Sequence, residues 1–274
     1  MIRAELLKLR TVTGTWVAVG IGAVGLLLTQ LLAVTLIPAL ASGAVRGVPA
    51  QNELGAVDPG SLEFQAAALN PLGSVVGSTG SIGVATIVVM VVGLLVATTD
   101  YRFGGLVTTA LAQPRHLRIL GGKVVATAIA AAALALVFAV ICVATLLVTT
   151  VALPAIEFVV PLGEVLGIVA RSVVVIVLLA LLGLAIGMLV RSQLAGVLVV
   201  IALLILEPIM QSVVQLVTGA VPAWAQLLPL SLGQAAIANS ADSAFPAVVA
   251  LPALALIVSV ATLAAGAVLR RRDL

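Results

Sequence analysis

Charged residues are the scarcest part of this sequence. Only 8% of its 274 residues are Asp, Glu, Lys or Arg, whereas 63% are hydrophobic, and the mean hydropathy is +1.35. Typical water-soluble domains are about 25% charged, because they need polar surface to stay dispersed. The composition therefore excludes a soluble globular protein and predicts an all-α polytopic membrane protein, with residues 1–274 forming a single domain.

Reactive side chains are equally scarce. The chain has one cysteine, Cys142, and one histidine, His116. A lone cysteine cannot form an internal disulfide, and a lone histidine cannot supply a His-based zinc pair or a serine triad. The Gly-Gly-Lys run at 121–123 is not a P-loop, because Leu117 and Val124 stand where that motif needs Gly and Ser or Thr. We therefore expect no catalysis and no cofactor bound by this chain.

Long apolar runs predict six membrane-spanning helices. A helix needs about 20 apolar residues to cross a bilayer. Segments of that kind lie at about residues 16–40, 79–99, 124–151, 166–190, 194–217 and 247–269. Residues 1–13 place apolar side chains at helical spacing among basic ones, which predicts a helix lying in the membrane interface. A basic segment with only a topological role fits those residues equally well.

The stretch between the fifth and sixth predicted spans is interrupted by proline, glycine and serine. Residues 218–246 contain Pro222, Pro229 and Asp242. Broken backbone at membrane depth persists only where it is buried in protein or lines a wet cavity. We therefore expect short re-entrant or interfacial helices here and no seventh span.

Basic residues divide unevenly between the two sides that six spans create. Of the 13 lysines and arginines, only Arg46 and Arg171 fall on the side away from the termini. Cytoplasmic loops carry the excess of basic residues, so both termini and the loop at 100–123 are predicted to be cytoplasmic. Arginine greatly outnumbers lysine beside abundant Ala, Val and Leu, which suggests a GC-rich bacterial genome. The predicted location is the bacterial cytoplasmic membrane.

The loop at 100–123 holds more polar residues than a hairpin turn requires. It lies between two long runs without charge, and something on that side of the membrane is expected to bind it. Its candidate contact residues are Asp100, Tyr101, Arg102, Gly104, Gly105, Pro114, Arg115, Arg118 and Lys123.

This loop and its surroundings resemble the permease subunit of type-2 ABC exporters, in the bacterial six-helix form whose ATPase is a separate chain. The matching fragments follow one another along the whole sequence as AELLKLR, DYRFGG, LAQP with a trailing Lys123, LLPLSLGQA and the closing RRRDL. The chain departs from the family pattern at Asp100, where Glu is more frequent, at Gly105, where Thr is common, and at His116, which lies in a usually more basic stretch.

The resemblance implies a coupling helix within residues 100–123 that docks on a cytosolic ABC ATPase. It also implies two permease chains per complex, identical or different, with ATP and magnesium bound by the partner ATPase. The implied function is ATP-driven export of a hydrophobic or amphiphilic substrate through the permease. We expect no nucleic-acid partner, because the basic residues are explained by topology.

Three residues inside predicted spans carry separate expectations. An acid within the bilayer is costly, so Glu207 either lines a transport path or is a structural carboxyl, bonded to backbone freed by Pro208 or paired with Arg171. Gly183 and Gly187 form a G-x-x-x-G pair, which commonly packs helices closely. An ion-coupled secondary transporter that uses Glu207, and a non-transporting membrane scaffold, remain alternatives to the ATP-driven permease.

Overall fold

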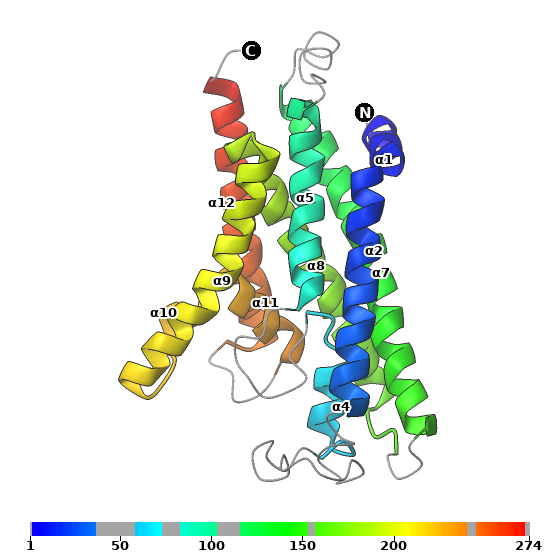
Figure 1. Ribbon diagram of the computed structural model, residues 1–274. Helices are drawn as coiled ribbons and strands as arrows, with labels where there is room; N and C mark the ends of the chain where they lie inside the picture. Colours follow the sequence, from blue (N-terminus) through cyan, green and yellow to red (C-terminus); the bar gives the residue numbers. More distant parts are fainter. Residues whose placement is uncertain are drawn as a thin grey trace.

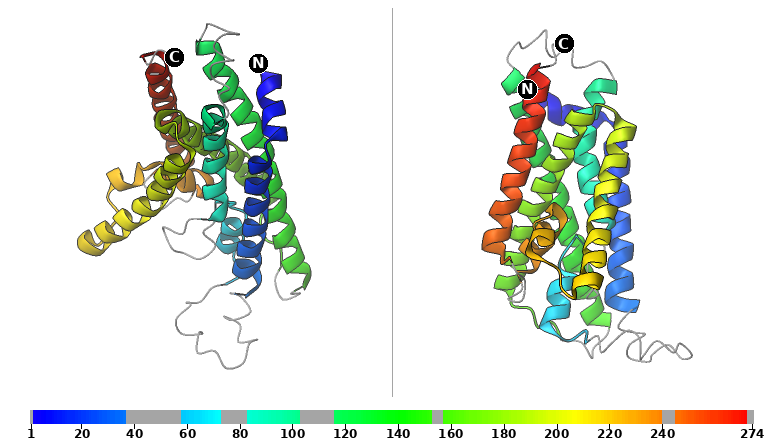
Figure 2. Two further views of the ribbon diagram at one scale, coloured as in Figure 1. Left: turned by 45° about the horizontal axis from the view of Figure 1, so that its top comes forward. Right: turned by 90° about the vertical axis from the view of Figure 1, so that its left-hand side faces the viewer.

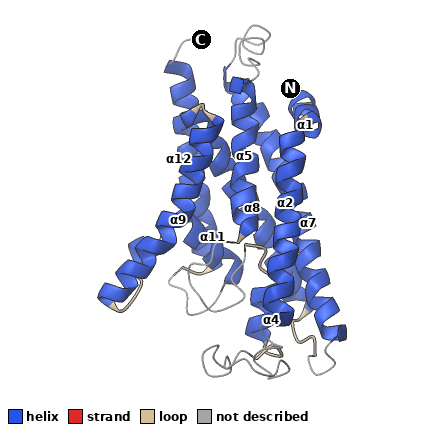
Figure 3. Ribbon diagram, viewed as in Figure 1, coloured by secondary structure: helices blue, strands red, loops and turns tan. Residues whose placement is uncertain are grey.

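The protein is a bundle of long helices (Figure 1). A computed structural model describes residues 2–36, 58–72, 83–102, 116–152, 157–239 and 245–271. Within these ranges every element of regular structure is a helix (Figure 3). The all-helical fold predicted from the sequence is therefore confirmed for the described residues.

Six long helices and four short ones make up the described chain. The long helices are α2 (Thr13–Leu31), which continues as the π-helical turn η1 (Leu32–Leu36), α5 (Val84–Arg102), α7 (His116–Ala152), α8 (Leu162–Val190), α9 (Gln193–Thr218) and α12 (Ala247–Arg271). The short helices are α1 (Ile2–Thr11), α4 (Leu62–Ala68), α10 (Ala223–Gln226) and α11 (Pro229–Ala238).

Five of the described helices are long and apolar enough to cross a membrane. They lie at Thr13–Thr35, Leu120–Val151, Leu162–Val190, Gln193–Thr218 and Ala247–Val268. The remaining predicted span is represented by the shorter apolar helix Val84–Thr99. At about 1.5 Å per residue this helix extends for roughly 24 Å, less than the roughly 30 Å hydrocarbon core of a bilayer. The structure thus supports a multi-pass membrane protein, and the count of six stays a prediction.

Helices α5 and α8 form the centre of the bundle, where their backbones approach each other without intervening side chains. A Cβ atom added to Gly93 of α5 would lie 1.8 Å from the carbonyl oxygen of Ala180 on α8. One added to Gly183 of α8 would lie 2.0 Å from the carbonyl oxygen of Met90, and Gly187 meets α5 one turn further on. The G-x-x-x-G pair thus lies in the α5–α8 contact, where only glycine fits.

The two ends of the bundle differ in the elements they carry. Helix α1 and the last turns of α12 lie at one end, together with the end of α5 and the start of α7 (Figures 1 and 2). The short connection between α8 and α9, which contains Arg191, joins them there. Helices α4 and α11 lie in the opposite half. The described segments that carry most of the basic residues therefore gather at one end.

Two predicted boundaries differ from the structure. The third span was predicted to begin at residue 124, but α7 begins at His116, and α5 continues to Arg102. The predicted loop at 100–123 is thus helical at both ends, because polar residues that leave the bilayer can extend a helix where they find water or a partner. Residues 103–115, where a separate coupling helix would lie, are outside the described residues.

Glu207 and Pro208 lie inside the predicted fifth span, where an acid and a proline would be expected to interrupt a helix, yet α9 runs through both without a break. Neighbouring groups and local adjustment allow proline within membrane helices. In Figure 1 the second half of α9 leans away from the bundle. Beyond it, α10 and α11 are short helices within residues 218–246, and their re-entrant or interfacial position in the membrane stays a prediction.

Replacing Gly93 or Gly183 with Ala should force α5 and α8 apart, because the added methyl group would overlap a backbone oxygen. Overpacking costs about 1–3 kcal/mol or more, so we expect both variants to lower the melting temperature in detergent. Gly121→Ala on α7 is the matched control, since a Cβ there meets nothing within 4 Å. Unchanged melting temperatures for Gly93→Ala and Gly183→Ala would contradict the backbone contact.

Candidate functional site

The polar residues predicted to lie in one loop at 100–123 are distributed between the end of α5, the start of α7 and the segment between them. Asp100, Tyr101 and Arg102 form the last turn of α5, whereas Arg118 and Lys123 belong to α7. Gly104, Gly105, Pro114 and Arg115 lie outside the described residues. The end of α5 and the start of α7 lie at the same end of the bundle, which keeps the helical members of the set on one side.

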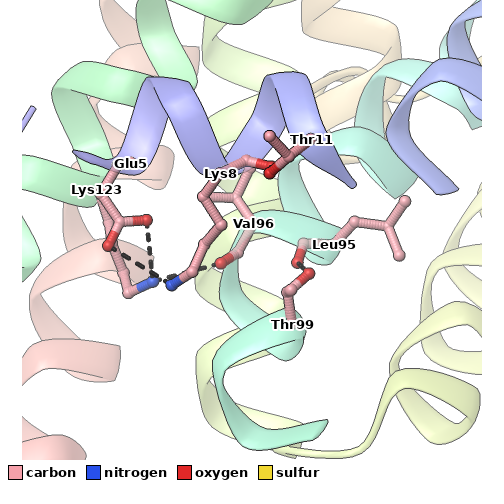
Figure 4. Close-up of polar contacts among 7 residues, drawn as sticks. All are labelled: Glu5, Lys8, Thr11, Leu95, Val96, Thr99 and Lys123. Atoms are coloured by element: carbon pink, nitrogen blue, oxygen red, sulfur yellow. Dashed lines mark hydrogen bonds and ion pairs between the residues drawn. The ribbon is translucent and has the colours of Figure 1, made fainter. Parts of the chain in front are cut away.

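Lys123 lies inside the bundle, although the sequence placed it in a cytoplasmic loop. Its exposed fraction is 4%. The Nζ atom lies 3.5 Å from Oε2 of Glu5 on α1 and donates a hydrogen bond of 3.3 Å to the carbonyl oxygen of Val96 on α5 (Figure 4). Lys123 therefore connects three helices. Removing one partner of a buried ion pair typically costs about 3–5 kcal/mol, because the remaining charge is left in a low dielectric.

Glu5 is the residue of this site that sequence reasoning missed. It is 8% exposed, and its Oε1 also lies 3.9 Å from Nζ of Lys8 on the same helix. The pattern of apolar residues in α1 gave Glu5 no role. A usable signal was present, because Glu5 is the only acidic residue before Glu53 and stands among basic ones. An isolated acid in a basic helix suggests a specific partner.

The inward face of α1 combines Glu5 with Leu9, one helical turn further on. Leu9 packs against a small buried cluster from α5, α8 and α12, which includes Val96, Met188 and Ala265. Leu7 points the other way and is 64% exposed. Among the side chains of α1 that the structure describes, Glu5 and Leu9 are the ones seen to contact the other helices of the bundle.

The junction between α1 and α2 is a single extended residue. Val12 has φ −79° and ψ 111°, so the helix stops and restarts there. The indole Nε1 of Trp16 donates a hydrogen bond of 2.9 Å to the carbonyl oxygen of Arg10, and the hydroxyl of Thr11 donates to the carbonyl of Lys8 at 3.1 Å. The Trp16 bond satisfies the carbonyl of Arg10 in the last turn of α1, while the carbonyl of Lys8 also accepts the amide of Val12 at 3.0 Å.

Glu207 binds the start of α11. The residue is 4% exposed, and its Oε1 accepts hydrogen bonds of 2.7 Å from both the amide and the hydroxyl of Ser231. Its Oε2 accepts a bond of 3.2 Å from the amide of Leu230. The N-cap residue of α11, Leu228, makes no side-chain cap. A carboxylate from α9 therefore takes that place, where the helix dipole favours a negative charge.

Arg171 binds the other end of the same short helix. Its Nε donates a hydrogen bond of 3.2 Å to the carbonyl oxygen of Ile237, in the last turn of α11. A cation is favoured at a helix C-terminus. The proposed pairing of Arg171 with Glu207 is thus replaced by a different arrangement, in which α8 and α9 hold opposite ends of α11. The Glu207 carboxylate likewise binds α11 and not the backbone beside Pro208.

Gln211 extends this contact one turn along α9. Its Nε2 donates to the hydroxyl of Ser231 and, at 2.9 Å, to the carbonyl oxygen of Ala225 in α10. The polar face of α9 is therefore fastened to both short helices, while residues on its other sides, such as Leu206 and Val213, are exposed.

The surroundings of Glu207 fit a structural acid better than an ion site. Three donors occupy its two oxygens, and the described residues contain no group of three His, Cys, Asp or Glu side chains that could hold a metal. A cavity of about 10 Å³ beside α11 is lined by Leu72, Thr86, Leu179, Leu230 and Gln234. That volume holds roughly one water molecule and no larger substrate.

No protein-family model matches this chain, and a search of curated protein sequences found no match. Function must therefore be inferred from the residues and their geometry.

Replacing Glu207 should destabilise the fold in the order Leu more than Gln. Leucine leaves two amides and a hydroxyl at the start of α11 without their acceptor, and each unsatisfied group costs about 1–3 kcal/mol. Glutamine keeps one acceptor oxygen but presents an NH₂ group to a donor. We expect the melting temperature in detergent to fall in that order.

The matched control is Gln215→Leu, an exposed position two turns further along α9. It should melt like the wild type. A Glu207→Leu variant that also melts like the wild type would show that α11 does not need its cap.

Proposed function

We propose that this chain is the permease subunit of an ATP-binding cassette transporter, which exports a hydrophobic or amphiphilic substrate when a separate cytosolic subunit hydrolyses ATP. The single observation that carries the proposal is the polar segment at residues 100–123. Its fragments DYRFGG and LAQP resemble the type-2 exporter permeases, and its two ends belong to the bundle helices α5 and α7.

The position of α5 makes it suited to transmit a force. Its residues from Val88 to Thr98 are almost all buried, and it contacts α8 backbone to backbone at Gly93 and Gly183. A partner that pushes on Asp100 to Arg102 therefore pushes on the central helix of the bundle. Two helices whose backbones are in direct contact are expected to move together when one is displaced, since protein interiors have low compressibility.

The proposed topology has six crossings, with both termini in the cytoplasm of a bacterium. It counts α5 as a crossing beside the five longer helices, and it places α1 in the interface and α10 and α11 as re-entrant helices. The common end shared by α1, the α8–α9 connection and the last turns of α12 supports an even number of crossings. Two such chains, identical or different, assemble with the ATPase in this proposal.

The ion-coupled alternative has less support. It requires Glu207 to exchange a proton or cation, whereas the carboxylate is occupied by three donors that cap α11. A neighbouring gene that encodes a Walker A ATPase would favour the ATP-driven permease over both the secondary transporter and the scaffold.

The topology predicts which introduced cysteines react with an impermeant maleimide in intact cells. Positions 58 and 242 should be labelled from outside, whereas positions 115 and 271 should not. Native Cys142 is 1% exposed, so it should give little background. External labelling at position 271 would overturn the even number of crossings.

Charge reversal in the polar segment should weaken ATPase docking. In Arg102→Glu and Arg115→Glu we expect membrane insertion to persist, because most of the cytoplasmic basic residues remain. Co-purification of the ATPase and permease-stimulated ATP hydrolysis should both fall, since like-charge or unpaired contacts disfavour association.

Arg46→Glu is the control for these two variants, because Arg46 is predicted to lie on the opposite side of the membrane. It should bind and stimulate the ATPase like the wild type. Loop variants that bind and stimulate normally would leave the segment with only a topological role.

A further inference from the structure

We propose that the outward side of α1, together with Trp16, binds the headgroup of an anionic phospholipid, and that the Arg10 guanidinium is the group that selects the negative charge. This site goes beyond the interfacial position given to α1 above, because it has a defined lipid class and a defined recognition residue. It requires the bundle to lie in a membrane, but it does not depend on the transport function.

Helix α1 lies at the level where the apolar parts of the bundle end. Its Glu5 pairs with Lys123, which in turn binds the carbonyl oxygen of Val96. Lys123 is the fourth residue of the apolar segment Leu120–Val151, and Val96 is the fourth from the end of Val84–Thr99. At about 1.5 Å per residue, both positions are roughly 5 Å inside those boundaries. Lipid headgroups begin just outside the hydrocarbon, so α1 is within their reach.

The outward side of α1 points sideways from the bundle. Helix α1 contacts α5 and α7 along their sides, because these helices continue past the contact to Arg102 and His116. Figures 1 and 2 show α1 at the edge of the bundle. The helical period places four exposed residues opposite the inward Glu5 and Leu9, namely Ala4, Leu7, Arg10 and Thr11. In a membrane this side therefore faces lipid.

Trp16 extends the same surface onto α2. Its side chain is exposed, and its Nε1 donates a hydrogen bond of 2.9 Å to the carbonyl oxygen of Arg10, which holds the ring beside the end of α1. The exposed residues that follow along α2 form an apolar stripe of Val17, Ile21, Val24 and Leu28. Tryptophan is enriched at the headgroup level of membranes. Arg10 is thus placed where this stripe meets the headgroups.

Charge complementarity identifies the occupant as an anionic lipid. The acid of α1, Glu5, faces inward, so Arg10 carries the one charge among the described side chains of the outward side. A guanidinium presents planar donors that match phosphate oxygens. Basic side chains near the surface are attracted to anionic lipids, and one arginine gives a preference of about fivefold. We therefore expect this surface to prefer phosphatidylglycerol to phosphatidylcholine.

Trp16 can report which lipid lies beside it. The full-length chain is purified with Trp224→Phe, which leaves Trp16 as the only tryptophan. It is reconstituted into phosphatidylcholine vesicles that contain an equal minor fraction of either brominated phosphatidylglycerol or brominated phosphatidylcholine, since bromine quenches indole fluorescence on contact. Quenching should show about fivefold stronger association of phosphatidylglycerol. Arg10→Gln should bring that ratio close to one, whereas Arg10→Lys should keep most of it.

The second tryptophan provides a matched control. Trp16→Phe leaves Trp224, which is exposed on α10, and α10 lies away from α1 in Figure 1. This variant should show no preference between the two brominated lipids. Because Arg10 is exposed, Arg10→Gln should melt like the wild type, so that a lost preference does not report unfolding.

Four results would overturn the lipid site. Equal quenching of Trp16 by both brominated lipids would exclude selection of charge. A preference that persists in Arg10→Gln would exclude Arg10 as the recognition residue. A preference of the same size at Trp224 would indicate a general attraction of the protein for anionic lipid. No quenching of Trp16 by either lipid would place this surface in water, where a protein partner could cover it.

Discussion

In lipid, backbone polar groups need hydrogen-bond partners from the protein, because lipid offers none. The long helices satisfy their own backbone, but a short helix such as α11 leaves unpaired groups at both ends. Glu207 binds the first turn of α11 and Arg171 binds the last. Charges are scarce in this sequence, and these two occupy the ends of a helix that would otherwise bury unsatisfied amides and carbonyls.

Helix α8 contacts both the central helix α5 and the short helix α11. It meets α5 where Gly93 and Gly183 remove any side chain between the backbones, and it reaches α11 through Arg171. Helix α9 reaches α11 from the other side through Glu207. Helix α8 therefore belongs to the central pair and also contacts α11. In the proposed permease, a displacement of α5 would be passed to α8 and could change how α11 is held.

The sequence predicted the features that depend on local pattern, and it failed where the partner lies far along the chain. Apolar runs locate the long helices, and the spacing of Gly183 and Gly187 indicates close packing. No local signal predicts that Gly93 of α5 lies in the same interface, because its contact with Ala180 requires the α5–α8 arrangement. The same limit applies to Gln30, whose Nε2 donates to the carbonyl of Ala68 at 3.0 Å and to Sγ of Cys142 at 3.3 Å.

Lys123 shows why a charge in a predicted loop cannot be assigned to a partner from sequence alone. The positive-inside pattern assigns Lys123 to the side that carries most of the basic residues, but that pattern does not say whether a lysine faces water or protein. Buried between Glu5 and Val96, Lys123 supports α1 and two bundle helices. If a change at Lys123 abolished ATPase stimulation, either a lost contact with the ATPase or a displaced α1 would explain the result. Arg102, at the end of α5, and Arg115, between α5 and α7, are predicted to face the partner. Only changes at such positions, with Glu5 and Lys123 left intact, can separate partner binding from the attachment of α1.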